Sequence, residues 1–402
     1  MPQFGIEPVV YIPKNPSYPL QDESLVNEIP EDVEVISQPI FEPYSLANIF
    51  SKKHTKDLSA GIISEEKKQS FLQKVMLYIR GNFFIPDARK FWVKPSVNFL
   101  ENYITDNPVD AIITTGPPHS LHLIGLALKQ KLGVKWIADF RDPWTTIGYH
   151  EKLRLSPKSQ KKHQNLEAKV LNTADHLLVT SPSTQRDFEQ KTNVPVTCIT
   201  NGFDEVELDA VELDRDFTLS HIGSLLSERN PVMLWEILAK LKQERVDFAE
   251  RLKIKLAGKV SDAVLQSLEE FGLKPNVDML GYLSHQDALR AQRSTFALLL
   301  LEIDSPETQV IIPGKVFEYL AARRPVVGIG PEDSDFFELI ENNGAGKCFN
   351  YHEAERLERY ILELFESFKA GKNLKCEGNI EKFTRKNLTG QLAETINKII
   401  TN

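Results

Sequence analysis

The sequence has little cysteine, no long apolar run and no excess of positive charge. Cys198, Cys348 and Cys376 are too few and too scattered for a disulfide framework or a zinc site, which suggests a reducing compartment. No apolar run approaches a membrane span, and the start MPQFGIEPVV lacks a basic segment followed by an apolar one. A net charge of -8 argues against nucleic acid as the main partner. We therefore expect a cytoplasmic protein.

Strands and helices alternate along most of the 402 residues, a length that suggests two or three domains. Short strands are expected at 6–13 and 33–40, and an amphipathic helix at 64–78 with Phe71, Leu72, Val75, Met76 and Ile79 on one face. Two alternating series follow, from 110 to 200 and from 217 to 329, separated by the acidic stretch 204–216. Branched apolar strands alternating with helices indicate parallel sheets covered on both faces. The predicted class is α/β.

Two loops follow predicted strands of the first series. GPPHS comes after Ala111–Ile113, and RDPW comes after Val134–Phe140. Ligands of parallel sheets bind at the carboxyl ends of the strands, so His119, Arg141 and Asp142 are candidate site residues. Two other interpretations stay open. His119 can simply cap the following helix, and Asp139, Arg141 and Asp142 can form a buried ion pair that fixes the loop.

The stretch PGKVFEYLAARRPVVG, residues 313–328, predicts a helix, and residues 326–329 predict a short buried strand after it. Proline suits the first helical position, so Pro313, Gly314 and Lys315 offer free backbone N–H groups to a phosphate. Lys315 and Glu318 are three residues apart and can face one ligand. The alternative is an exposed helix pair beside an ordinary turn.

Two further stretches each allow two interpretations. RGNFFIPDARKFWVKP, residues 80–95, suits a membrane surface or an amphiphilic acceptor, but Phe83, Phe84, Phe91 and Trp92 can equally be core residues. Asp214-Arg215-Asp216 has the spacing of a metal-binding Asp-x-Asp, yet it lies in the acidic stretch just before a strand. Metal sites need converging oxygen ligands, so no metal is expected there.

At TTGPPHSLHLIG, IADFRDPW, SHIGSLLSERNP and PGKVFEYLAARRPVVG the chain resembles nucleotide-sugar-dependent glycosyltransferases of the GT-B fold, closest to glycosyltransferase family 4. The resemblance implies two facing Rossmann-like domains with parallel sheets. It implies an acceptor domain at 1–203, a linker at 204–216, a donor-nucleotide domain at 217–380 and, at 381–402, a C-terminal helix that crosses back to the first domain.

The same resemblance implies roles for individual residues of the second domain. Gly223 and Ser224 would approach the diphosphate through their backbone, and Arg229 would stand where the family usually has a lysine. Ser224 replaces a family arginine, whose charge Lys259 or Lys315 would supply. Glu318 matches the glutamate that holds the ribose. Its family partner falls at Val310, which is apolar, and Glu302, Asp304 or Glu307 would substitute; in the first domain Arg141 falls near the catalytic-loop histidine.

The implied activity is transfer of a hexose from a nucleoside-diphosphate sugar to a saccharide or lipid-linked acceptor, with retention and without metal or cofactor. The negative charge on the leaving diphosphate would be stabilised by Arg229 and by the helix start at Gly314 and Lys315. Surface polysaccharide or glycolipid assembly, with peripheral contact at the inner membrane surface, would be its setting. A nucleotide-sugar epimerase and a non-catalytic nucleotide-binding protein are the alternatives.

The beginning of the chain departs from the family pattern. GT-B proteins normally have a strand ending in a glycine-rich loop, and then a helix, before the strand that IEPVVYIP resembles, and the sequence has no room for them. We expect either a truncated sequence or a first domain without this central strand.

Overall fold

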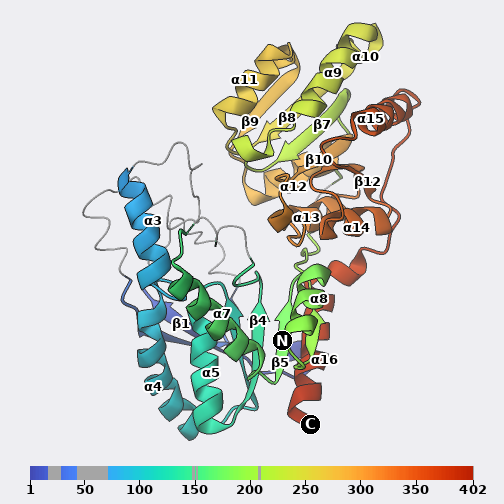
Figure 1. The fold of residues 1–402 in the computed structure, drawn as a ribbon. Helices are drawn as coiled ribbons and strands as arrows, with labels where there is room; N and C mark the ends of the chain where they lie inside the picture. Colours follow the sequence, from blue (N-terminus) through green and yellow to red (C-terminus); the bar gives the residue numbers. More distant parts are fainter. Residues whose placement is uncertain (17–28, 43–70, 147–149, 151–152, 207–209, 402) are drawn as a thin grey trace. The chain divides into compact units, whose positions relative to one another are not determined.

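A computed structural model describes residues 1–16, 29–42, 71–146, 150, 153–206 and 210–401. The chain divides into two compact units (Figure 1), the first formed by Met1–Thr200 and Thr389–Asn402 and the second by Asn201–Leu388. The stretch 204–216, predicted to be a linker, is therefore counted with the second unit. Each unit is described below by itself.

The first unit holds two parallel sheets. A two-stranded sheet pairs β1 with β2, and a four-stranded sheet has the order β3-β4-β5-β6. Its strands are β1 Val9–Lys14, β2 Glu34–Pro39, β3 Ala111–Gly116, β4 Lys135–Phe140, β5 His176–Val179 and β6 Val196–Cys198. Its helices are α3 Phe71–Phe83, α4 Lys90–Asp106, α5 Ser120–Leu132, α7 Pro157–Leu171, α8 Pro182–Lys191 and most of α16 Arg385–Thr401. Residues 64–70 of the predicted amphipathic helix lie outside the described residues.

The two faces of β4 pack against different helices, as the period of two in a strand requires. Trp136, Ala138 and Phe140 pack in one cluster with residues of α7 and α8. Ile137 points the other way and packs with Ile396 and Ile399 of α16. The final helix thus covers one face of this sheet, and the sheet is buried on both sides.

Helices α4 and α5 lie side by side in Figure 1 and share a smaller core with β1. The ring of Tyr11 on β1 stacks on buried Trp92 of α4 at 4.9 Å between centroids. Among the described residues, β1 pairs only with β2 and β3 only with β4, so each keeps one edge without a strand partner. The expected truncation of the sequence stays a prediction.

The second unit is a six-stranded parallel sheet with the order β12-β11-β10-β7-β8-β9. Its strands are β7 Phe217–Ile222, β8 Leu252–Ala257, β9 Val277–Gly281, β10 Ala297–Leu301, β11 Val326–Ile329 and β12 Gly346–Phe349. Its helices are α9 Val232–Glu244, α10 Val246–Arg251, α11 Asp262–Glu270, α12 His285–Ser294, α13 Lys315–Ala322, α14 Asp335–Asn342 and α15 Ala354–Lys369. The chain reverses its direction of winding between β7 and β10, and such a switch point is where α/β sheets bind ligands.

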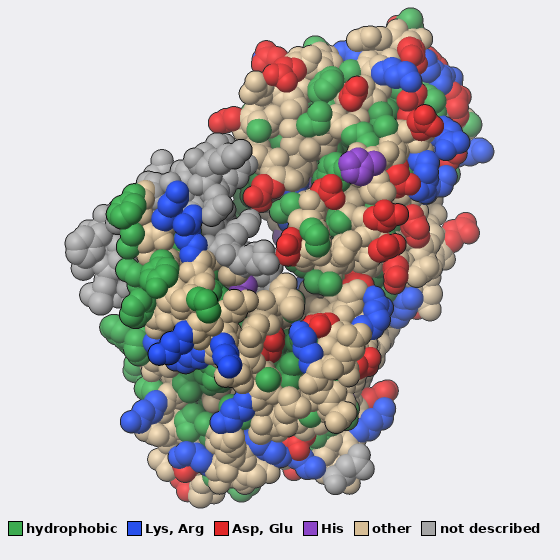
Figure 2. Space-filling model, viewed as in Figure 1, with side chains coloured by type: hydrophobic (Ala, Val, Ile, Leu, Met, Phe, Trp, Pro, Cys, Tyr) green, Lys and Arg blue, Asp and Glu red, His purple; other side chains and the backbone are tan. Residues whose placement is uncertain are grey.

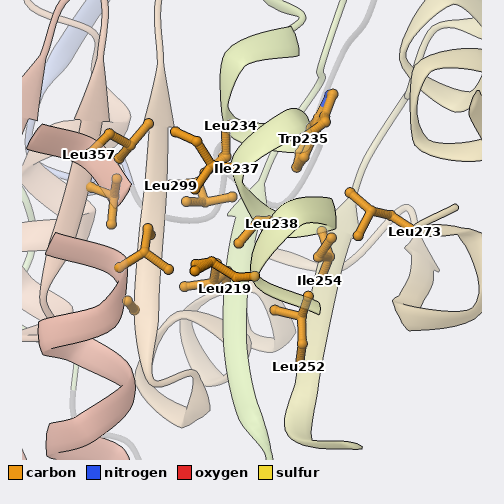
Figure 3. Packing of buried hydrophobic residues seen from close by; sticks show 14 of the residues in the cluster. Leu219, Leu234, Trp235, Ile237, Leu238, Leu252, Ile254, Leu273, Leu299 and Leu357 are labelled. Carbon is orange, nitrogen blue, oxygen red and sulfur yellow. The ribbon is translucent and has the colours of Figure 1, made fainter. Parts of the chain in front are cut away.

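Alternate leucines of β10 explain why this sheet is covered on both faces. Ala297, Leu299 and Leu301 pack with residues of α9, α11 and α15, whereas Leu298 and Leu300 pack with residues of α13 and α14. Figure 3 shows Leu219 of β7, Ile254 of β8 and Leu299 of β10 pointing toward Leu234 and Leu238 of α9. The predicted α/β class with parallel sheets in two domains is confirmed.

Helix α13 begins later than the sequence suggested. Gly314 is its N-cap and Lys315 its first residue, so Pro313 lies before the cap and not at the first helical position. The helix ends at Ala322 because Arg323 adopts a left-handed conformation with φ 55°, and Pro325 excludes further helix. Strand β11 then occupies Val326–Ile329, as predicted.

Candidate functional site

A tight glycine turn follows β7 at the switch point of the second unit. Gly223 has φ +132° and donates its N–H to Ala257 O at 3.0 Å. Gly258, with φ +88°, follows β8, and a Cβ there would lie 2.9 Å from the carbonyl carbon of Gly223. Both positions therefore require glycine, because of their backbone conformation and because the two turns touch.

The ammonium of Lys315 lies directly over this turn. A Cβ on Gly223 would lie 2.2 Å from Lys315 Nζ, so the turn and the side chain occupy neighbouring space only because residue 223 is glycine. Lys315 Nζ also lies 3.4 Å from Nε2 of His221, a buried side chain on β7. The other ring nitrogen of His221 lies 2.9 Å from Leu299 O, which ties the imidazole to the neighbouring strand β10.

A second cation stands beside the turn in the short helix η4, Ser227–Arg229. Arg229 donates from Nε to Glu302 Oε1 at 2.9 Å and from Nη2 to Glu302 Oε2 at 3.3 Å. Glu302 follows the last residue of β10 and is almost completely buried. We call His221, Gly223, Arg229, Glu302 and Lys315 the switch-point cluster.

The start of α13 adds backbone donors near Lys315. Val316 N–H and Phe317 N–H donate to Pro313 O and Gly314 O at 3.0 and 3.2 Å. In the described part of the chain this leaves the amides of Gly314 and Lys315 without a hydrogen-bond partner. Free amides at a helix start carry partial positive charge and favour an anion.

The electrostatics of the switch-point cluster are dominated by positive charge near a buried carboxylate. Burial and the charge of Arg229 lower the pKa of Lys315 to about 8, against the raising effect of Glu302 and Glu318. Burial, followed by Lys315, lowers the pKa of His221 to about 3, so this imidazole is neutral at pH 7. Because an anion beside Lys315 would favour its charged form, the cluster is suited to bind one.

Glu318 has a different set of neighbours from Lys315. Its Oε2 accepts a hydrogen bond from Gln292 Nε2 of α12 at 2.8 Å. Gln292 is buried, and its Oε1 has no hydrogen-bond partner among the described residues. Glu318, Gln292, His285 and Phe203 line a small pocket of the second unit. That Lys315 and Glu318 meet one ligand stays a prediction.

In the first unit, the loops after β3 and β4 are linked through Arg141. Its Nη2 donates to Pro117 O at 2.7 Å, and its backbone N–H donates to Gly116 O at 2.9 Å. Within the described residues Arg141 forms no ion pair with Asp139 or Asp142. The alternative in which such an ion pair fixes the loop is therefore wrong. Burial raises the pKa of Asp139 and of Asp142, and the charge of Arg141 lowers both.

His119 lies in a buried aromatic cluster at the same loops. Its ring stacks on Trp144 with 4.9 Å between centroids and 2° between planes. Neither ring nitrogen has a partner among the described residues, and burial holds its pKa well below the ordinary value. His119 is the N-cap residue of α5, as the capping alternative predicted, but its side chain makes no capping hydrogen bond. The first amide of the helix, Ser120 N–H, instead donates to Asp87 Oδ2 at 2.8 Å.

The two aspartates of the Asp-x-Asp sequence are held by separate cations. Lys255 Nζ lies 2.7 Å from Asp214 Oδ2, and Arg251 Nη1 lies 3.5 Å from Asp216 Oδ1. In the described part of the chain, no group of three or more His, Cys, Asp or Glu side chains has the geometry to hold a metal ion.

Two family models match the chain side by side. The model of Glycosyltransferase Family 4 matches residues 61–207, and the model of Glycosyl transferases group 1 matches residues 216–367. The second match contains the whole switch-point cluster. The chain is a glycosyltransferase of the GT-B fold.

Solved structures agree with this fold. The glycosyltransferase is similar to a sucrose-phosphate synthase from Thermosynechococcus elongatus, with a TM-score of 0.55 and 14% identity over 77% of this chain and 78% of that one. The lipopolysaccharide outer core galactosyltransferase WaaB gives a TM-score of 0.51 and 12% identity over 92% of this chain and 85% of that one. At such identities the likeness concerns the fold alone. No curated protein matches the glycosyltransferase in sequence.

The structure brings some of the predicted donor-binding residues of the glycosyltransferase together and not others. Gly223, Arg229, Gly314 and Lys315 gather at the switch point. Ser224, whose predicted contact is through its backbone, follows Gly223 in the same turn, and its N lies 3.1 Å from where a Cβ on Gly258 would be. Pro313 precedes the cap of α13. Lys259 is exposed, and of the two proposed substitutes for the arginine missing at Ser224 only Lys315 lies over Gly223.

The sequence does not point to two residues of this region: the pattern around His221 predicts a buried strand, and the pattern around Gln292 predicts a surface position of a polar helix. For Glu302 the sequence predicts a substitute for a ligand-binding glutamate, but both of its oxygens accept hydrogen bonds from Arg229. A charged residue directly after the run FALLLL is the signal that points to Glu302, since buried carboxylates need a partner.

Proposed function

We propose that this glycosyltransferase moves a hexose from a nucleoside-diphosphate sugar to a saccharide or lipid-linked acceptor. The single observation that carries the donor part is the position of Lys315 over the Gly223 turn, close enough to Arg229 for the charge of Arg229 to lower the pKa of Lys315. A diphosphate at this turn would meet two cations and the free amides of Gly314 and Lys315.

We propose further that the reaction retains anomeric configuration and uses no metal. The diphosphate develops negative charge as it leaves, and preorganised donors stabilise that charge without reorganisation. Lys315 and Arg229 supply two positive charges, as a divalent ion would in a metal-dependent transferase. In the proposed front-face reaction the acceptor hydroxyl oxygen bonds to the anomeric carbon on the side where the bond from that carbon to the diphosphate oxygen breaks, and a diphosphate oxygen takes the hydroxyl proton.

In this proposal the other residues predicted from the sequence contact either the nucleoside of the donor or the acceptor. Glu318 holds the ribose, because a carboxylate accepts hydrogen bonds from hydroxyl groups. Arg141, Asp142 and His119 act at the strand-end loops of the first unit. Surface polysaccharide or glycolipid assembly in the cytoplasm is the proposed setting.

Helix α3 supports a peripheral contact with an anionic lipid surface. Phe71, Val75, Tyr78, Ile79 and Phe83 are exposed at spacings that form one stripe, with Phe71 at 83% and Phe83 at 63% exposure. The sequence predicts an amphipathic helix here and leaves open what its apolar face contacts. In the view of Figure 2, hydrophobic side chains gather over α3 with Lys and Arg side chains beside them. The core alternative is confirmed for Trp92, which is buried, and is wrong for Phe83 and Phe91, which are exposed.

Charge complementarity points to anionic headgroups as the occupant of this surface. Helix α3 itself carries Lys74 and Arg80 and neither Asp nor Glu, although the whole chain carries -8. Burial and the nearby charge of Lys162 lower the pKa of Lys90, which lies 5.0 Å over the Phe91 ring. An apolar stripe beside lysines is typical of interfacial binding. In the described residues no helix is long and apolar enough to cross a bilayer.

Vesicle sedimentation tests the membrane part. The protein is expected to bind vesicles containing phosphatidylglycerol, and the double variant Phe71→Ser/Phe83→Ser is expected to lose most of that binding. Val246→Ser is the matched control, because Val246 is also exposed but lies in the second unit. Equal binding of all three proteins would contradict the proposed surface.

A panel of UDP-, GDP- and ADP-linked hexoses tests the enzymatic part. We expect one donor to release its nucleoside diphosphate only when a saccharide or lipid-linked acceptor is present, with product in the anomeric configuration of the donor and unchanged rate in a chelator. Isomerisation of the donor without acceptor would instead indicate an epimerase, and binding without turnover a non-catalytic protein. Either result would contradict the proposal.

A further inference from the structure

Glu302 is an unusual carboxylate because it is charged, buried and fully engaged. It follows β10 at the switch point, and its side chain is 3% exposed. Arg229 donates to both of its oxygens, and Ile303 N–H donates to Oε1 at 2.9 Å. The neighbouring backbone is also fixed, since Tyr351 Oη donates to Glu302 O at 2.7 Å. The carboxylate therefore has one well-defined position.

The same contacts leave part of Arg229 available. The guanidinium uses its Nε and Nη2 edge for Glu302, and its side chain is 32% exposed. Its Nη1 group is not used by Glu302. A bidentate pair fixes the plane of a guanidinium, so the remaining donors point in a defined direction.

We propose that Glu302 is a positioning residue of the donor site, whose buried carboxylate holds Arg229 beside the Gly223 turn and offsets the positive charge of Arg229 and Lys315. This inference rests on the proposed function, in which these two cations bind a diphosphate. It differs from a role as a direct ligand of the sugar, because Arg229 and Ile303 N–H already occupy its oxygens.

The charges around Lys315 give Glu302 its second effect. Lys315 faces Arg229 from η4, Glu302 after β10, Glu318 on its own helix and the neutral His221 on β7. Burial and Arg229 lower the pKa of Lys315 to about 8, and Glu302 raises it. Removing the charge of Glu302 therefore lowers the pKa of Lys315 further, and the ammonium deprotonates at lower pH.

The test measures nucleoside diphosphate affinity between pH 6 and pH 10 by calorimetry. UDP, GDP and ADP are the probes, and the one that binds the wild-type protein is used throughout. Wild-type affinity is expected to fall as pH rises through about 8, because the neutral amine of Lys315 no longer attracts the diphosphate. Glu302→Gln is expected to bind about tenfold more weakly and to lose affinity at a lower pH than wild type.

A second variant separates position from charge. Glu302→Asp keeps the charge but is one methylene shorter, so it is expected to weaken binding while the pH midpoint stays that of wild type. If Glu302→Gln does not fold, Glu302→Asp alone tests whether Glu302 positions Arg229. Glu353→Gln is the matched control, because Glu353 also pairs with an arginine, Arg356, and accepts a backbone N–H, that of Asn350. It should leave affinity and midpoint unchanged.

The outcomes distinguish the two proposals. If wild-type protein binds none of the nucleoside diphosphates, the proposed function fails and this inference with it. If wild type binds and Glu302→Gln keeps the wild-type midpoint, Glu302 has only a structural role and the inference alone is overturned. Wild-type affinity of a folded Glu302→Asp would overturn the positioning of Arg229.

Discussion

Replacing Gly223 with alanine adds a single carbon atom, the Cβ, to the turn at which the diphosphate is proposed to bind. The new Cβ would lie 2.2 Å from Lys315 Nζ and 2.3 Å from its Cε, so the lysine must move. Because these atoms are the far end of a flexible side chain, the fold can accommodate the change. The backbone cost is separate, since φ +132° is a conformation that alanine rarely adopts. Such strain costs on the order of 1–3 kcal/mol.

The expected loss of ligand affinity follows from the displaced ammonium. A hydrogen bond to a charged group contributes about 1.5–3 kcal/mol, and about 1.4 kcal/mol is a factor of ten, so the expected loss is roughly 10- to 100-fold. Calorimetry with the nucleoside diphosphate that binds the wild-type protein measures this loss of affinity, and urea denaturation measures the loss of stability. In Gly223→Ala we expect both the affinity for the nucleoside diphosphate and the free energy of unfolding to decrease.

Gly272→Ala separates strain from binding. Gly272 lies in the same unit with φ +66°, and no atom lies within 4 Å of an added Cβ. This control is expected to lose stability, by about 1–2 kcal/mol, while its affinity stays that of wild type. If Gly223→Ala binds the nucleoside diphosphate as tightly as Gly272→Ala does, Lys315 does not act over the Gly223 turn and the reasoning is refuted.

Three further predictions concern single side chains. Lys315→Met should bind nucleoside diphosphate at least tenfold more weakly and show no loss of affinity as pH rises through about 8, the pKa of Lys315; a retained pH dependence in calorimetry would assign it to another group. Glu318→Ala should weaken nucleotide binding while circular dichroism and Tm show an intact fold, and unchanged affinity would exclude Glu318 from the ribose site. Burial lowers the pKa of His122 to about 3, so below its ordinary value of 6.5 the unfolded chain takes up a proton that the folded chain does not, and stability falls by up to about 1.4 kcal/mol per pH unit. His122→Phe should reduce that slope in urea denaturation between pH 6.5 and pH 4, and an unchanged slope would contradict a buried neutral imidazole.

Much of the fold can be predicted from local sequence patterns. The alternation of buried strands and helices predicts parallel sheets, and the β11 bounds match the predicted strand because Pro325 and a run of apolar residues define them. The exposed stripe of α3 was not predictable, since the same periodicity of Phe71, Val75 and Ile79 also suits a core-facing helix. Periodicity tells which residues share a face but not what that face contacts.

In the candidate site, too, the sequence predicts single residues but not the contacts between them. Gly223 and Lys315 could be named from short motifs, because glycine turns and helix starts after strands have recognisable sequences. The contact between these two distant positions could not, and neither could the pairing of Arg229 with Glu302 or of Glu318 with Gln292. These contacts depend on the strand order β10-β7-β8, which places the ends of distant strands side by side.

The central claim is that the switch-point cluster binds a diphosphate. Calorimetric titration of the full chain with a nucleoside diphosphate and with the nucleoside that lacks the phosphates tests it most directly. Binding through Lys315, Arg229 and the Gly314 amide predicts at least a hundredfold tighter binding of the diphosphate, because two charge-assisted contacts together contribute about 3 kcal/mol or more. Equal affinities for the two ligands would contradict the account.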